Sequence, residues 1–140
     1  DAILRKQACH RMRSTSSALG YAAVSTAHHL NAKCIVIPSA TGSTARLVSK
    51  FHPKVEMLGL SPEERTLRRM QIYWGVRPYK SVEAKNMEDI CENALEIARA
   101  KVGVDSGDIV VLTAGIPATH AVCREQKYGV SNMMRIVTIE

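Results

Sequence analysis

The stretch CIVIPSATGSTA (residues 34–45) decides how this chain folds. Its first four residues are all apolar, which is typical of a strand that is buried on both faces. Small and hydroxylated residues come next, and an amphipathic run, RLVSKF (residues 46–51), follows them. We therefore expect a buried strand, a tight turn at residues 39–45 and then a helix.

Two interpretations of this turn are open. A helix that begins near Ser43 would offer the unpaired amides of its first turn, at the positive end of the helix dipole, to an anion. Hydroxyl side chains would surround that anion, namely those of Ser39, Thr41, Ser43 and Thr44. Alternatively, the same hydroxyls simply cap the helix. No lysine follows Gly42 as a P-loop requires, so the turn does not match that motif.

Outward from the turn, apolar runs alternate with helical patterns. We expect strands at residues 34–37, 55–60, 76–79, 109–114 and 133–139, and helices at 14–30, 46–51, 61–75 and from the region of Ile90 to Gly103. Ser61 should cap the third helix, with Pro62 in its first turn and Glu64 closing a capping box. Pro78 marks the third strand as an edge strand.

This alternation predicts an α/β fold, a parallel sheet with helices on both faces. Right-handed crossovers restrict the topology to a few arrangements. If strands two and three lie on one side of strand one and strands four and five on the other, the order is 3-2-1-4-5, and the winding reverses between strands one and four. The hydroxyl-rich turn and the long segment 115–132 would meet at that point. Arg124 and Lys127, together with His120, would close over a bound phosphate, or the segment is simply a surface excursion.

Composition describes an ordinary globular domain. The chain has 140 residues, of which 46% are hydrophobic and 23% charged, so it forms one domain with a sizeable core. It contains no run long enough to cross a membrane and no apolar signal-peptide core, from which we expect a cytoplasmic protein. The net charge of +6 comes from dispersed residues with only 4% aromatics, which argues against nucleic acid as a partner. The four cysteines are far apart in the sequence and form no zinc or redox motif.

Two further groups of charged side chains are explained without a bound ligand. Arg65, Arg68 and Arg69 form a basic face that would bind phosphate, although a solvated flank paired with Glu63 and Glu64 is favoured. Residues 1–13 carry five basic or histidine side chains and are expected to be a connecting arm.

Several motifs in a fixed order resemble the C-terminal domain of pyruvate kinase. They are NAKCIVIPSATGSTARLVSKFHPK (31–54), SPEERTLRRMQIYWGVRP (61–78), SGDIVVLTAG (106–115) and SNMMRIV (131–137). The resemblance covers the chain from about residue 14 to its end, and residues 1–13 would connect it to an upstream barrel. It implies a three-layer α/β/α domain whose mixed five-stranded sheet has the order 3-2-1-4-5, with the last strand antiparallel.

The same resemblance implies a role in regulation and assembly. The parent enzyme transfers a phosphoryl group from phosphoenolpyruvate to ADP with Mg²⁺ and K⁺, in a barrel that this chain lacks, so we expect no cofactor and no catalytic residue here. An activating phosphorylated effector would place a phosphate at Ser39, Thr41, Gly42, Ser43 and Thr44, and the loop that begins at Gly115 would fold over it. Residues 80–91 contain neither the Trp nor the Arg that hold fructose 1,6-bisphosphate in the family, which points to another phosphorylated effector or to none.

The resemblance also implies partners. The barrel domain and further copies of the chain, in a homotetrameric parent, are expected to contact this domain, with the last strand and an adjacent helix at the contact between copies. A free-standing sensor for a phosphorylated small molecule is the alternative, because a fold does not fix a function.

Overall fold

A computed structural model of the chain describes residues 15–39, 41–84, 86–114 and 133–140. Helices and strands alternate along it. Their bounds are α2 Thr15–His29, β1 Cys34–Pro38, α3 Ser43–Ser49, β2 Glu56–Ser61, α4 Glu64–Met70, β3 Val76–Lys80, α5 Met87–Lys101, β4 Ile109–Ala114 and β5 Met133–Thr138. The expected arm at residues 1–13 lies outside the described residues.

The strands form one sheet of order β3-β2-β1-β4-β5. β1 pairs in parallel with β2 and with β4, and β2 pairs in parallel with β3. β5 runs antiparallel to β4. The predicted strand order, the antiparallel last strand and the position of Pro78 on an edge strand are therefore all confirmed.

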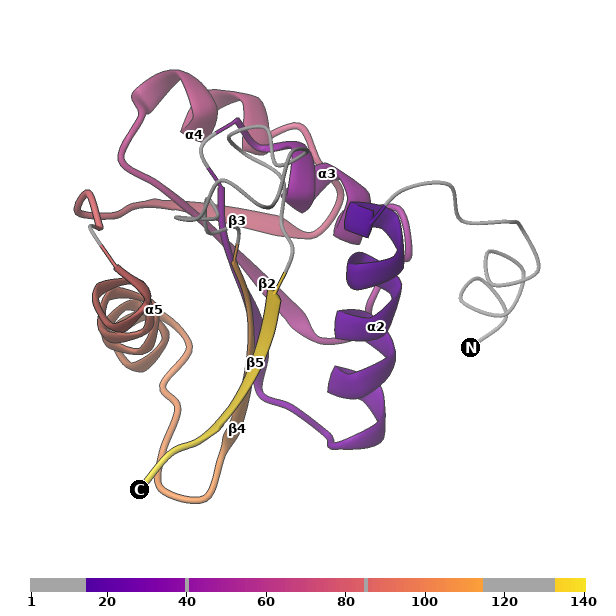
Figure 1. Ribbon diagram of the computed structural model, residues 1–140, viewed down its shortest axis with the longest axis vertical. Coiled ribbons are helices and arrows are strands. Elements are labelled where there is room, and N and C mark those ends of the chain that lie inside the picture. The colour runs from indigo at the N-terminus through magenta and orange to yellow at the C-terminus, as the bar shows by residue number, and fades with distance from the viewer. Residues whose placement is uncertain (1–14, 40, 85, 115–132) are drawn as a thin grey trace, which may run out of the picture.

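Helices cover both faces of the sheet and create two apolar layers (Figure 1). On one face α2, α3 and α4 pack over residues such as Ile35, Ile37 and Met57. On the other face α5 packs over the alternate side chains, including Val36, Leu58 and Leu112. The central strands are buried on both sides because every second side chain enters a different layer.

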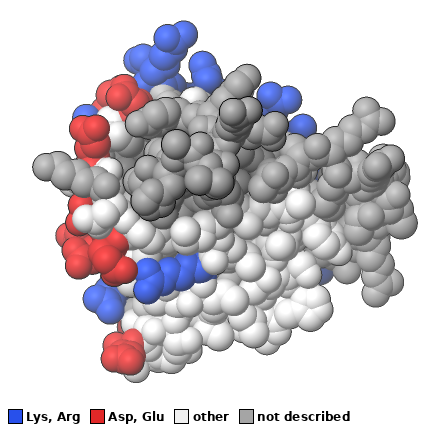
Figure 2. Space-filling view, viewed as in Figure 1, with Lys and Arg blue, Asp and Glu red and all other residues white. Residues whose placement is uncertain are grey.

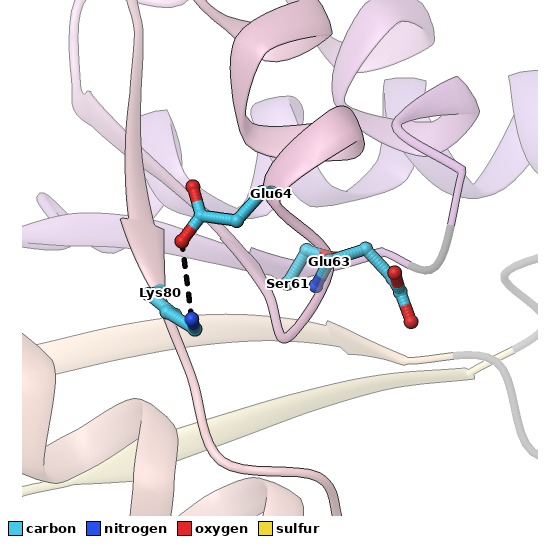
Figure 3. A network of polar contacts seen from close by, with 4 residues as sticks. All are labelled: Ser61, Glu63, Glu64 and Lys80. Atoms are coloured by element: carbon cyan, nitrogen blue, oxygen red, sulfur yellow. Dashed lines mark hydrogen bonds and ion pairs between the residues drawn. The ribbon is translucent and has the colours of Figure 1, made fainter.

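The predicted capping box at Ser61 is wrong. Ser61 is the last residue of β2, it pairs with Lys80 of β3, and its carbonyl accepts a hydrogen bond from the amide of Ser81 (3.1 Å). The helix α4 begins only at Glu64, after Glu63, and has no side-chain cap. Ser61 Oγ accepts a hydrogen bond from the Glu63 amide (3.2 Å), and Glu64 forms an ion pair with Lys80 instead of closing a box (Figure 3).

The third helix is also shorter than expected. It ends at Met70, and a turn that closes at Gly75, with φ of 70°, leads into β3. Ser61 is held at the end of β2 by its pairing with Lys80, and its Oγ is bound to the Glu63 amide, which lies before the first residue of α4.

Candidate functional site

The candidate site is the loop that joins β1 to α3. β1 lies between β2 and β4. The strands β2 and β3 follow on one side of β1, and β4 and β5 lie on its other side, so this loop stands at the switch point of the sheet. Ligands of open α/β sheets bind at the carboxyl ends of strands at such a point. The predicted residues 39, 41, 42, 43 and 44 all lie in this loop or in the first turn of α3.

Hydroxyl groups shape the loop from within. Ser39 Oγ accepts a hydrogen bond from the Gly42 amide (2.8 Å), and the Thr41 and Ser43 hydroxyls lie 3.0 Å apart. The Ser43 amide donates a hydrogen bond to Thr41 Oγ1 (3.4 Å). Ser39 and Thr44 are buried, whereas Thr41 and Ser43 are exposed. Two of the four predicted hydroxyls, those of Thr41 and Ser43, therefore face the surface.

Hydroxyls cap α3 only in part: Thr41 Oγ1 accepts a hydrogen bond from the amide of Ser43, the first residue of the helix, but the N-cap position itself carries no side chain. The residue at the N-cap of α3 is Gly42, in the left-handed region with φ of 83°, and it makes no side-chain capping bond. A Cβ atom at Gly42 would lie 3.3 Å from Met70 Cγ and 3.6 Å from both Thr66 Cγ2 and Tyr73 Cε2. Glycine is thus required here both by the backbone conformation and by the closeness of α4.

The helix α4 contributes a cation to the loop. Arg69 Nη1 donates a hydrogen bond to the carbonyl oxygen of Thr41 (3.2 Å), while Glu64, the expected partner of the arginines, is bound to Lys80. Arg69 is exposed, as a solvated flank requires, but it binds the Thr41 carbonyl rather than the Glu64 carboxylate. Figure 2 shows Lys and Arg side chains at the top of the view, the part of the molecule where α4 and α3 lie in Figure 1.

A buried hydroxyl that the sequence did not single out lies at the same end of the sheet. Thr113, one residue beyond the pairing of Val36 with Leu112, is fully buried, and its Oγ1 has no hydrogen-bond partner within the described structure. Buried polar groups without partners are rare in folded proteins. The end of β4 thus presents a polar group next to β1 at the switch point. The other predicted site residues, Gly115, Arg124 and Lys127, lie outside the described residues, as does His120.

Nothing in the described structure resembles a metal or redox centre. Among the described residues no three Asp, Glu, His or Cys side chains are grouped as metal ligands. Cys34 and Cys91 are buried free thiols, and burial raises the pKa of Cys34 to about 12. A thiol with such a pKa is an inert core residue. No helix in the part of the chain that is described is long and apolar enough to cross a membrane.

Comparisons with known proteins agree with this geometry. The family described as "Pyruvate kinase, alpha/beta domain" matches residues 17–137. The chain is 35% identical over 123 residues to pyruvate kinases of Staphylococcus aureus strains USA300 and COL, an alignment that covers 88% of this chain and 20% of each relative. A crystal structure of a pyruvate kinase from Cryptosporidium parvum superposes with a TM-score of 0.83 at 26% identity, over 99% of this chain and 26% of that one.

The match concerns a single domain, since the chain spans about a fifth of the length of these curated relatives (20%). Sequence family, sequence identity and three-dimensional similarity all point the same way, and the sheet order agrees with them. The chain therefore belongs to the family of pyruvate kinase alpha/beta domains, the C-terminal domain of that enzyme.

Proposed function

We propose that this chain is the regulatory and oligomerisation domain of a cytoplasmic pyruvate kinase and has no catalytic site of its own. The parent reaction, phosphoryl transfer from phosphoenolpyruvate to ADP in glycolysis, would take place in a barrel domain that holds Mg²⁺ and K⁺. The present domain would bind a phosphorylated small-molecule effector and join copies of the enzyme. Membership of the family supports this assignment.

The loop before α3 carries the proposal of an effector site. The exposed hydroxyls of Thr41 and Ser43 lie 3.0 Å apart, and Arg69 binds the carbonyl of Thr41 from the side. An arginine has five N–H donors, so this single bond leaves donors for phosphate oxygens. Gly115, Arg124 and Lys127 are proposed to close over the same ligand.

The strand β5 supports the oligomeric role. It pairs with β4 on one side only, and Met133 and Ile136 are 36% and 47% exposed. Exposed apolar side chains on an edge strand with unpaired backbone groups favour pairing with a second copy. We therefore place the contact between copies at β5 in a homotetrameric parent.

A thermal-shift experiment tests the effector site. The melting temperature of the chain is measured with ribose 5-phosphate, AMP, sugar phosphates and inorganic phosphate. At least one of them should raise it, because a ligand that binds only the folded state stabilises it by RT ln(1 + [L]/Kd). Thr41→Asp should abolish the shift by charge repulsion, whereas Ser106→Asp, in an exposed turn outside the site, should retain it.

Two outcomes would contradict the proposal in different ways. A folded sample that no phosphorylated compound stabilises has no working effector site. The alternative, a free-standing sensor of a phosphorylated compound, shares that site but lacks the barrel. An in-frame barrel upstream of Asp1 would support the proposal, whereas a start codon with a ribosome site there would favour the sensor.

A further inference from the structure

Two exposed arginines of α4 lie on the same flank of the helix, beside the loop before α3. Arg69 binds the Thr41 carbonyl (3.2 Å), and Arg65 precedes it by four residues, which places the two about 40° apart around the helix and about 6 Å apart along it. We propose that Arg65 and Arg69, which we call the α4 subsite, hold a second anionic group of the effector whose phosphate lies at the Thr41 and Ser43 hydroxyls. This inference rests on the proposed function and names the class of its effector.

The α4 subsite is not neutralised by carboxylates of the domain. Glu64, one of the two expected partners of the arginines, is bound to Lys80 instead (3.1 Å), as Figure 3 shows. In the part of the chain that the structure describes, neither Glu63 nor Arg65 forms an ion pair. A guanidinium group offers a planar fork of donors that fits two oxygens of one phosphate. The donors of Arg65 are therefore available to an anion.

The helix α3 adds a cation on the other side of the loop. Arg46 follows Ser43 by three residues, and both side chains are exposed, so they lie on the same face of α3. The hydroxyls of Thr41 and Ser43 thus lie between a cation of α3 and the α4 subsite. Cations that converge on one loop from two helices attract a multiply charged anion more strongly than a singly charged one.

The start of α5 is unsuited to a second anionic group. It lies at the same end of the sheet as the loop, because β1, β2 and β3 run parallel and α5 follows β3. Its first turn carries Glu88 and Asp89, and its N-cap is filled by the side chain of Asn86. The nearby cation, Arg135, is bound to Glu88 (3.5 Å) and to Cys91 Sγ (3.1 Å).

The charges of the surface agree with this difference between the two helices. In Figure 2 most of the Asp and Glu side chains in view lie on the left, where α5 lies in Figure 1, whereas Lys and Arg side chains lie at the top, near α4 and α3. A ligand whose phosphate is held at the loop is therefore repelled on the side of α5 and attracted on the side of α4.

A compound with two phosphates matches this distribution of charge. A monophosphate at the Thr41 and Ser43 hydroxyls leaves Arg65 without an anionic partner among the described residues. A second phosphate that reaches Arg65 gains charge-assisted hydrogen bonds. Because Arg65 is exposed, solvent screens this attraction, and we expect a gain in affinity of about fivefold. The effector class is thus a sugar bisphosphate or a nucleoside diphosphate.

Titration calorimetry on the chain with two pairs of compounds tests the α4 subsite. The pairs are glucose 6-phosphate with glucose 1,6-bisphosphate, and AMP with ADP, and each pair differs by one phosphate. In at least one pair the compound with two phosphates should bind about fivefold more tightly than its monophosphate. The pair that shows the preference identifies which of the two chemical classes the site accepts.

Substitutions of exposed arginines assign the preference to its source. Arg65→Gln should remove it while leaving the Kd of the monophosphate within about twofold, the range of a neutral surface change. Arg65→Lys, which keeps the charge but lacks the planar fork, should retain part of it. Arg99→Gln, on the exposed face of α5, is the matched control, because it removes the same charge on the other side of the sheet. It should leave the preference unchanged.

The opposite results are distinct. Monophosphates that bind as tightly as their partners with two phosphates would overturn the α4 subsite and leave the proposed effector site standing. A preference that survives in Arg65→Gln, or that Arg99→Gln removes equally, would also overturn it. If none of the four compounds binds to a folded sample, the proposed effector site is refuted and this inference with it.

Discussion

Gly59→Ala is the most informative single substitution in the domain. Gly59 lies in β2, and a Cβ atom there would come within 2.6 Å of Met70 Sδ and 3.0 Å of Val76 Cγ1. Met70 is fully buried, and Val76 nearly so, which leaves the added methyl group little room. Overpacking of this kind typically costs about 1–3 kcal/mol. Urea denaturation should therefore give a free energy of unfolding lower by about that amount, with an unchanged m-value.

The same methyl group should weaken the candidate site. Met70 also lies beneath Gly42, where a Cβ atom would be 3.3 Å from Met70 Cγ. Displacing Met70 away from Gly59 pushes it toward the loop before α3, because a packed interior transmits a displacement. We expect the Kd of whichever phosphorylated compound stabilises the wild type to rise in Gly59→Ala, measured by titration calorimetry under conditions where the variant is folded.

A double-mutant cycle decides whether Met70 is the obstacle. In the Met70→Ala background only the Val76 contact remains beside Gly59, so Gly59→Ala should cost clearly less there. An equal cost of Gly59→Ala in both backgrounds would refute the packing argument. A cost below about 0.5 kcal/mol in the wild-type background, the range of a neutral surface change, would do the same.

Two further predictions concern α2. Gly20→Ala should raise the free energy of unfolding by about 0.5–1 kcal/mol through helix propensity, because its Cβ would meet Val48 Cγ2 at an ordinary 3.5 Å; a lower value in urea denaturation would contradict this. His28 Nε2 accepts a hydrogen bond from the Lys54 amide (3.1 Å), and burial, with the charge of Lys54, lowers the pKa of His28 below 6.5. The unfolded chain then binds the proton more tightly, so stability should fall as the pH drops below 6.5, and less so in His28→Asn. An imidazole that titrates above pH 6.5 by NMR would contradict the assignment.

Patterns with a long-range meaning made the fold predictable. The runs CIVI (34–37) and IVVL (109–112) are apolar at every position, and a strand with helices on both sides buries such a run. Pro78 identified an edge strand because a central strand cannot spare an amide. Both inferences depend on chemistry that any fold must satisfy.

Local signals failed where a distant partner decided the outcome. The series Ser61, Pro62, Glu63, Glu64 has the composition of a helix start, yet Ser61 is held in the sheet by β3. The hydroxyl-rich turn indicated where the candidate site lies, but the approach of Arg69 to Thr41 could not be predicted, because it depends on how closely α4 lies on β2. Gly59 and Met70 set that closeness, and they are far from the loop in sequence.

The helix α4 links the candidate site to the β3 edge of the sheet. Within seven residues it contributes Met70 beneath the loop and Arg69 at the carbonyl of Thr41, and two residues later the chain reaches the exposed Ile72, which precedes β3. A shift of Met70 must therefore be absorbed by the turn that carries Trp74, or else by the loop. Trp74 is the only tryptophan in the chain, so its fluorescence distinguishes these cases directly. If the emission maximum of Gly59→Ala equals that of the wild type, the loop alone accommodates the methyl group. A changed maximum means that the turn that carries Trp74 moves with α4.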